Sequence, residues 1–195
     1  RAISNMEKQQ LFGNSTDFGA LKKSFKSLED KYSLFSPLYR ISGSIAKDIH
    51  GNQLGTFLSH FFEGTLKTEG IELYFTNRFD RHIIHIKEPV IYSVLINIIN
   101  NALYWLRNTV QKKIELDYMK ETDAMIIRNS GTPIIEARLE RIFELFYTNR
   151  PGGRGIGLFL AKQTLNANYF DIYATNAPEY NTLGGACFVI KSLDA

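Results

Sequence analysis

Cysteine is almost missing from this 195-residue sequence, in which Cys187 is the one cysteine. A single cysteine excludes an internal disulfide and fits a reducing compartment, so we expect this part of the protein to be cytoplasmic. No apolar run approaches the roughly 20 residues that a membrane-spanning helix needs, and no signal-peptide pattern opens the sequence. Because the first residue is Arg1, we expect a piece of a longer protein, which leaves room for a membrane anchor elsewhere.

The sequence also lacks a large net charge of either sign. The formal net charge is +3 at pH 7, and the arginines are concentrated near one glycine-rich stretch, so the composition does not favour a nucleic-acid partner. Hydrophobic residues make up 44% of the chain, which is enough for one core plus a short appendage. The sequence contains no internal repeat and no low-complexity tract, so we expect a soluble enzyme or binding domain.

Three parts follow one another along the chain. Residues 1–16 are polar and rich in turn formers, and we expect a linker or a frayed segment. In residues 17–45 the apolar positions recur at alternating spacings of four and three, which is a heptad pattern and predicts a long helix. These positions are Leu21, Phe25, Leu28, Tyr32, Phe35 and Leu38. The helix is either one arm of a dimerising hairpin or a helix packed on the domain that follows, at residues 46–195.

The third part alternates between helical and strand patterns. Helices are predicted at residues 54–66, 90–108 and 155–166, and strands at 71–76, 83–86, 113–118, 124–128, 170–174 and 186–191. The strands at 113–118 and 124–128 are expected to form a hairpin. This order favours an α/β fold with a helical layer on one face of a mixed sheet.

The stretch from Arg150 to Leu158 joins glycines and arginines directly to the start of a predicted helix. Glycines let the backbone approach an oxyanion and adopt positive φ. The helix that follows offers unpaired N–H groups and the positive end of its dipole. The stretch therefore predicts a phosphate-binding loop, although the same composition is also typical of a tight turn.

Two asparagines interrupt the apolar face of the helix predicted at 90–108. Asn97 and Asn101 lie four residues apart, so their side chains project side by side. A buried amide without a partner costs about 1–3 kcal/mol. Either a polar ligand lies against this pair, or the two amides cap a neighbouring loop.

Four motifs in a fixed order carry a family resemblance, and a fifth, weaker motif follows them. They lie at residues 97–102 (N-x-x-x-N-A), 126–134, 141–146 and 153–158, and the fifth at 184–188. Together they resemble the nucleotide-binding domain shared by histidine kinases, gyrase, the large heat-shock chaperone and MutL. The resemblance implies a two-layer α/β sandwich, with a mixed, mostly antiparallel sheet covered by helices on one face and preceded by a long helix. It also implies that residues 46–195 form an ATP-binding catalytic domain.

The resemblance implies roles for the two asparagines and for the adenine site. Asn101 is the expected Mg²⁺ ligand, because Mg²⁺ prefers oxygen ligands and keeps several waters. Asn97 cannot act as a general base, so it is expected to orient a phosphate or support the metal, which favours phosphoryl transfer over rapid hydrolysis. Asn129 and Gly131 correspond to the adenine site, where the family usually has aspartate in place of Asn129. An asparagine oxygen can still accept a hydrogen bond from the exocyclic amine of adenine.

Further nucleotide-binding residues are expected in two overlapping segments. One is the lid, the loop that follows the motif at residues 141–146 and covers the nucleotide in the resembled family, and the other is the glycine loop at residues 150–158. The expected residues are Phe146, Thr148, Arg150, Gly153, Arg154, Gly155, Ile156, Gly157 and Leu158. Phe143 and Phe146 are expected to anchor the lid in the core. Arg150 and Arg154 are suited to neutralise phosphate charge, or they are solvated loop arginines. Tyr104 stands where many kinases have a lysine near the phosphates, so that contact is either absent or supplied by Arg107.

The function that the resemblance implies is the ATP-binding catalytic domain of a sensor histidine kinase, which transfers a phosphoryl group from ATP to a histidine. None of His50, His60, His82 and His85 lies in the usual phosphoacceptor pattern, so the acceptor is expected outside this sequence. The implied partners are a second copy of the chain, bound through the N-terminal helix, and a response regulator or another protein substrate. The alternative is a nucleotide-gated conformational ATPase or a scaffold module without phosphotransfer.

Overall fold

The computed structural model describes residues 44–193. The linker expected at residues 1–16 and nearly all of the heptad helix expected at 17–45 lie outside the described residues. Within the described part, no helix has the length and apolar character needed to cross a membrane.

Five strands form the main sheet, in the order β2–β4–β5–β7–β6. They are β2 (Glu72–Phe75), β4 (Lys113–Met119), β5 (Ala124–Asn129), β6 (Phe170–Ala174) and β7 (Cys187–Ser192). β2 pairs with β4 in parallel, and every other pair in this sheet is antiparallel. The expectation of a mixed, mostly antiparallel sheet is therefore confirmed, as is the hairpin of β4 and β5.

A separate two-stranded antiparallel sheet joins β1 (Lys47–His50) to β3 (Ile83–Ile86). The predicted strands at 71–76 and 83–86 are both present, but they belong to different sheets. The short helix α4 (Asn77–Arg81) lies between them, and the side chain of Thr76 caps it by accepting a hydrogen bond from the backbone N–H of Phe79.

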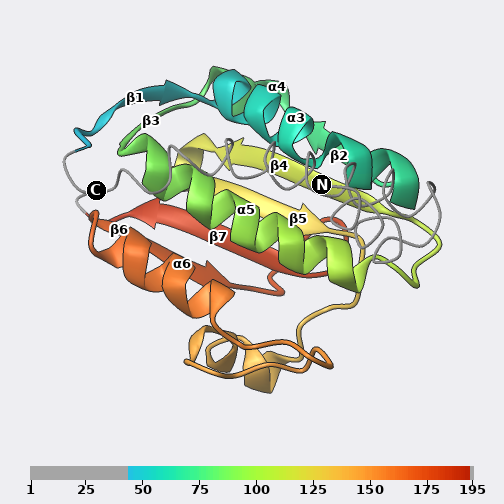
Figure 1. The fold of residues 1–195 in the computed structure, drawn as a ribbon. Coiled ribbons are helices and arrows are strands. Elements are labelled where there is room, and N and C mark those ends of the chain that lie inside the picture. Colours follow the sequence, from blue (N-terminus) through green and yellow to red (C-terminus); the bar gives the residue numbers. More distant parts are fainter. Residues whose placement is uncertain (1–43, 194–195) are drawn as a thin grey trace, which may run out of the picture.

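Three longer helices lie across one face of the main sheet (Figure 1). They are α3 (Gly51–Glu69), α5 (Glu88–Trp105) and α6 (Gly157–Asn166). Short 3₁₀ helices lie in the connecting segments at Lys120–Thr122 (η2), Glu136–Arg138 (η3) and Arg141–Phe143 (η4). This arrangement is the two-layer α/β sandwich that the sequence predicted.

α5 is the central helix of the core, because apolar side chains surround it on most sides. Val90, Val94, Leu95 and Ile98 are fully buried, and they pack with the inward side chains of β4, β5 and β7. Polar side chains on such a helix stay only where its surface is open or where a partner is available. Asn97 and Asn101, in the C-terminal half of α5, therefore lie where the apolar core ends and a cavity begins.

The other face of the main sheet holds a buried ionic network. Arg128 of β5 lies directly opposite Glu115 of β4 in the strand register, and its Nε donates to Glu115 Oε1 at 2.9 Å. Its Nη2 also donates to Asp117 Oδ2 at 3.0 Å. Burial alone would raise the pKa of Asp117, but hydrogen bonds from Thr76 and Arg78 hold that pKa below its ordinary value.

Candidate functional site

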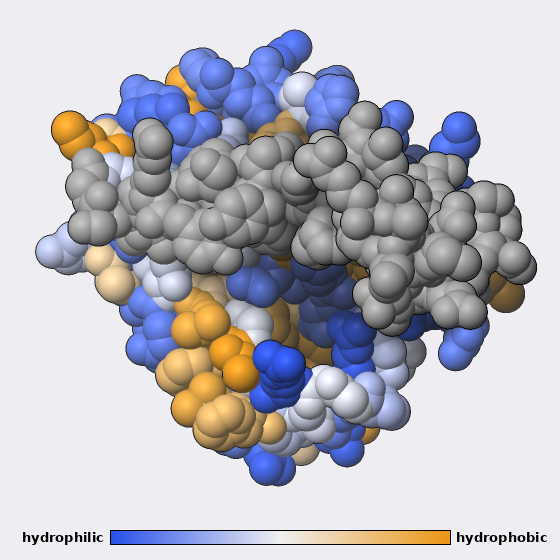
Figure 2. Space-filling view, viewed as in Figure 1, coloured by the Kyte–Doolittle hydropathy of each residue, from blue (hydrophilic) through white to orange (hydrophobic). Residues whose placement is uncertain are grey.

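A cavity of about 620 Å³ lies where the C-terminal half of α5, the N-terminus of α6 and the loops between β5 and α6 meet. Its lining is Asn97, Asn100, Asn101, Trp105, Thr132, Pro133, Ile134, Ile135, Arg138, Ile142, Tyr147, Thr148, Asn149, Arg150, Gly153, Arg154, Gly155, Ile156, Gly157, Leu158, Leu160 and Ala186. Hydrophobic side chains gather over α6 (Figure 2), and Leu158 and Leu160 of this helix belong to the lining. The cavity thus has an apolar side and a polar side.

The polar side brings the two predicted asparagines together with the start of α6. Asn97 and Asn101 both line the cavity, and Trp105 Nε1 donates to Asn101 Oδ1 at 3.2 Å. An amide oxygen has two acceptor positions, so Asn101 keeps one for a ligand. A Cβ on Gly157 would lie 3.1 Å from Asn97 Oδ1, and glycine at this position therefore lets α6 approach α5 closely.

No side chain caps the N-terminus of α6, where Ile156 is the N-cap residue. The first N–H groups of a helix have no partner within the helix, and together with the helix dipole they favour a bound anion. These N–H groups belong to the same glycine loop that lines the cavity. The polar side can therefore bind phosphate.

The glycine loop has the backbone conformation that its sequence suggests. Gly155 has a φ of 63°, and a Cβ there would lie 2.4 Å from the carbonyl carbon of Phe146. The backbone N–H of Phe146 donates to the carbonyl oxygen of Gly155 at 2.9 Å. The backbone N–H of Gly153 donates to the carbonyl oxygen of Arg150 at 2.8 Å. Thr148 Oγ1 accepts a hydrogen bond from the backbone N–H of Arg150 at 3.1 Å. These contacts fold the lid back on itself beside the cavity.

Two arginines from the lid supply positive charge. Arg150 and Arg154 both line the cavity, whereas Arg107 does not. The Arg150 guanidinium lies 4.4 Å from the ring centroid of Tyr104, and that of Arg107 lies 5.6 Å from the same ring. Arg150 of the lid therefore lies nearer to the Tyr104 ring than Arg107 does, and of these two arginines Arg150 lines the cavity.

The apolar side is formed partly by the segment that connects β5 to α6 in the sequence, and its residues include Pro133, Ile134 and Ile142. Asn129 and Gly131, the predicted adenine residues, do not line the cavity. Asn129 is only 2% exposed, and its Oδ1 accepts a hydrogen bond from the backbone N–H of Gly131 at 2.8 Å. This oxygen, which we expected to face the base, thus already has a partner.

Phe143 and Phe146 differ in their surroundings. Phe143 is 6% exposed and packs edge-on against Phe188, so its role as a core anchor is confirmed. Phe146 is 69% exposed, has a φ of 66° and does not line the cavity. The prediction that it anchors the lid in the core is therefore wrong, because the tight turn against Gly155 directs its side chain outward.

Several lining residues were not among the predicted site residues. Asn100 lies between the two asparagines that we identified, and Trp105 lies one turn beyond Asn101, so both could have been found from helical spacing. The sequence gave little indication that Ile135, Arg138 and Ala186 line the cavity, because they belong to segments whose position depends on the tertiary fold.

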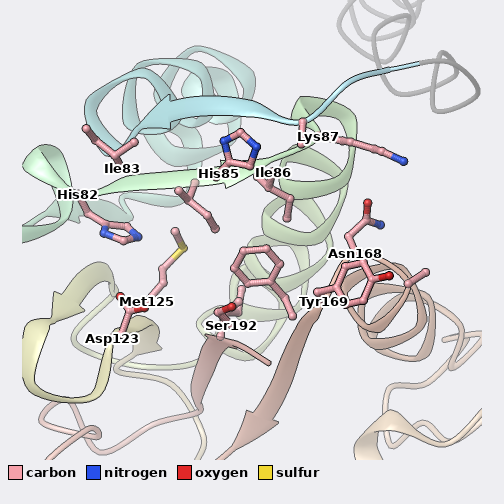
Figure 3. A pocket seen from close by; sticks show the side chains of 15 residues that line it. His82, Ile83, His85, Ile86, Lys87, Asp123, Met125, Asn168, Tyr169 and Ser192 are labelled. Carbon is pink, nitrogen blue, oxygen red and sulfur yellow. The ribbon is translucent and has the colours of Figure 1, made fainter. Parts of the chain in front are cut away.

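A second cavity, of about 480 Å³, lies at the other end of α5, against β3 and the start of β6 (Figure 3). His82 and Lys87 are on its rim, and Met125 and Ile190 are among its apolar walls. His82 stacks on Tyr118 at 3.8 Å between centroids, and burial lowers its pKa although Asp123 opposes this effect. No glycine loop borders this cavity, although Lys87, the N-cap residue of α5, lines it and makes no capping hydrogen bond through its side chain. Residues 44–193 contain no group of three metal-binding side chains.

Comparison with known proteins agrees with the geometry of the first cavity. A family model described as "Histidine kinase-, DNA gyrase B-, and HSP90-like ATPase" matches residues 86–195. The chain is 31% identical over 157 residues to the sensor histidine kinase WalK of Bacillus subtilis, an alignment that covers 72% of this chain and 25% of WalK. It is 27% identical over 130 residues to the signal transduction histidine-protein kinase AtoS of Escherichia coli, covering 64% of this chain and 21% of AtoS. The chain thus spans about a quarter of the length of these curated relatives.

Solved structures show the same fold. The catalytic domain of histidine kinase ThkA superimposes with a TM-score of 0.61 at 25% identity, covering 74% of this chain and 93% of that domain. ThkA in complex with the response regulator TrrA gives a TM-score of 0.60 at 20% identity, covering 97% of this chain and 55% of that one. At 20% identity, this second likeness concerns the fold alone.

Proposed function

Because this chain belongs to the family of histidine kinase-, DNA gyrase B- and HSP90-like ATPases, we propose that it is the ATP-binding catalytic domain, at residues 46–195, of a sensor histidine kinase. The intact protein then transfers the γ-phosphoryl group of ATP to a histidine. The relatives WalK and AtoS, which are named as histidine kinases, support this proposal. The phosphoacceptor histidine belongs to a part of the protein outside this chain.

The triphosphate would lie on the polar side of the cavity. The N–H groups at the start of α6 and the guanidinium groups of Arg150 and Arg154 would bind its oxygens. Thr148 and Asn149 of the lid also line this side. The purine would then lie on the apolar side, above Asn129 and Gly131.

The donor set fits Mg²⁺ held mainly by the nucleotide. One amide oxygen, Asn101 Oδ1, retains an acceptor position, and Asn97 lies one turn away to orient a phosphate. Mg²⁺ often uses only one or two protein ligands together with phosphate oxygens and waters. The metal would neutralise charge on the phosphates, while the asparagines position the γ-phosphoryl group for an external acceptor.

A single observation favours phosphotransfer over hydrolysis. None of the described residues that line the cavity carries a carboxylate, so no side chain is placed to act as a general base for water. A conformational ATPase needs repeated hydrolysis, whereas a kinase needs only a well-oriented γ-phosphoryl group and an acceptor. The cavity therefore supports the kinase better than the ATPase alternative.

The partners proposed for the intact protein are a second copy of the chain, bound through residues 17–45, and a response regulator. The heptad pattern supports the first partner. The second is supported by the structural neighbour ThkA, which was solved in complex with the response regulator TrrA.

Calorimetric titration with a non-hydrolysable ATP analogue, with and without Mg²⁺, tests the proposed site. We expect Mg²⁺ to strengthen binding and Asn101→Ala to remove this strengthening while leaving the melting temperature without ligand nearly unchanged. Asn52→Ala, at an exposed asparagine of α3, is the matched control and should bind like the wild type. If Asn101→Ala unfolds the domain, Asn101 is structural. Rapid ATP turnover without an acceptor protein would favour the ATPase.

A further inference from the structure

Trp105 is the last residue of α5 and lies one helical turn beyond Asn101, the proposed Mg²⁺ ligand. Its side chain is half-buried and lines the nucleotide cavity. The indole Nε1 donates a hydrogen bond to Asn101 Oδ1 at 3.2 Å. Trp105 is also the one tryptophan in the 195-residue sequence, so a change of tryptophan in this chain changes this position alone.

Contacts on two sides hold Trp105 in place. Its ring packs edge-on against that of Tyr104, with 5.0 Å between the centroids and an interplanar angle of 87°. Its backbone carbonyl lies against the turn after β5, because a Cβ on Gly131 would lie only 3.0 Å from the Trp105 carbonyl oxygen. The indole N–H is therefore presented to Asn101 by protein contacts alone.

The hydrogen bond from Trp105 decides which way the Asn101 amide faces. The oxygen and the NH₂ group of an asparagine side chain are similar in size, so packing alone distinguishes them poorly, whereas Mg²⁺ requires the oxygen. An indole N–H can only donate. It therefore favours the amide whose oxygen faces Nε1 and disfavours the flipped amide, in which two donors would face each other. The oxygen has a second acceptor position, which is available to the metal.

We propose that Trp105 is a positioning residue for the metal. Its indole N–H keeps the Asn101 oxygen turned toward Mg²⁺, and so favours binding of the Mg²⁺–nucleotide complex over the metal-free nucleotide. Hydrogen bonds from neighbouring groups commonly orient metal ligands in this way. The inference rests on the proposed function, because it takes Asn101 as a ligand of the Mg²⁺ bound to ATP. It goes beyond that function by naming the residue that sets the metal dependence of binding.

The test compares the dissociation constants of a non-hydrolysable ATP analogue with and without Mg²⁺, whose ratio measures how much the metal strengthens binding. Trp105→Phe keeps an aromatic ring but has no N–H. It should lower this ratio about threefold to tenfold, the effect of losing one hydrogen bond, and change the metal-free constant by less than about twofold. Tyr169→Phe removes a polar group from an exposed aromatic side chain that does not line this cavity, and should leave both constants unchanged.

A second substitution keeps the shape of the side chain. Replacing the one tryptophan of the chain by its benzothiophene analogue, in which sulfur takes the place of the N–H group, removes the donor from this position alone. The analogue fills nearly the same volume, so the protein should fold as the wild type does and show the same lowered ratio as Trp105→Phe. This variant decides the question even where Trp105→Phe disturbs the packing against Gly131.

If both variants weaken binding equally with and without Mg²⁺, Trp105 acts by packing against the nucleotide, and the inference is overturned. A ratio that stays at the wild-type value in both variants, while Asn101→Ala still removes the strengthening, also overturns the inference and leaves the proposed function standing. If the wild type binds no ATP analogue, or binds it no better with Mg²⁺, the proposed site itself fails, and the inference fails with it.

Discussion

At the scale of single residues, Tyr104 connects the helix to the lid. Its ring lies on α5, and the Arg150 guanidinium lies 4.4 Å from the ring centroid. A cation over an aromatic face contributes about 0.5–1 kcal/mol at an exposed site, which is enough to bias the position of a loop side chain. Tyr104 thus helps to position the guanidinium of Arg150, which lines the cavity.

Replacing the ring should therefore weaken nucleotide binding through Arg150. Tyr104→Leu should reduce the affinity for a Mg²⁺–ATP analogue by about two- to fivefold, while Tyr104→Phe, which keeps the ring, should retain the affinity. Calorimetry on both variants, repeated in an Arg150→Ala background, measures the coupling. If Tyr104→Leu weakens binding equally with and without Arg150, the contact between the two side chains contributes nothing to the site.

Sequence motifs located the candidate site but not all of its contacts. The asparagines, the glycine loop and the lid arginines could be predicted, because their spacing expresses the local geometry of a helix start and a tight loop. The contact of Arg150 with Tyr104 joins residues 46 positions apart, and the Asn129–Gly131 bond depends on a particular side-chain orientation. The outward direction of Phe146 likewise follows from a turn closed by Gly155, which no periodicity predicts.

At the scale of elements, the lid between η4 and α6 depends on its glycines in two different ways. Gly152 and Gly155 both have positive φ, at 73° and 63°. A Cβ on Gly152 would meet nothing within 4 Å, whereas one on Gly155 would meet the backbone of Phe146 and Tyr147 at 2.4–2.7 Å. The first position therefore requires only a backbone conformation, while the second also requires close approach of two chain segments.

This difference gives a matched pair of variants. Gly152→Ala and Gly155→Ala both incur about 1 kcal/mol of left-handed strain, but only Gly155→Ala should displace the glycine loop and reduce nucleotide affinity by tenfold or more. Titration with the ATP analogue and thermal melting of both variants separate affinity from stability. Equal loss of affinity in the two variants would show that strain alone, rather than the close approach at Gly155, governs the loop.

The longer elements were predicted well, and two of the shortest were not. α3, α5 and α6 and the longer strands of the main sheet have enough residues to express a period. β1 has four residues and α4 has five, and neither was predicted, whereas β2 and β3, which also have four residues each, were found from their alternating pattern. The pairing of β3 with β1, and of β2 with β4, also depends on contacts between distant segments.

At the scale of the whole molecule, a buried ionic network lies on the face of the main sheet opposite α3, α5 and α6. Arg128, at 6% exposure, joins β5 to both acidic residues of β4. Its Nη1 also donates to the carbonyl oxygen of Tyr180 at 2.7 Å, which attaches the loop between β6 and β7. One side chain thus connects three segments, and buried ions of this kind are strongly destabilising when one partner is removed.

Arg128→Met should therefore lower the free energy of unfolding by about 3 kcal/mol, because it leaves Glu115 and Asp117 buried without their shared cation. The loss should lie at the low end of the range for such pairs, since Lys113 stays near Glu115 and Arg78 stays near Asp117. Urea denaturation measures the change. Arg141→Ala removes the exposed pair of Arg141 with Glu144, whose side chains are 58% and 57% exposed, and should change the free energy by less than about 0.5 kcal/mol. A similar small change in Arg128→Met would mean that the remaining cations satisfy both carboxylates, and that the sheet does not depend on Arg128.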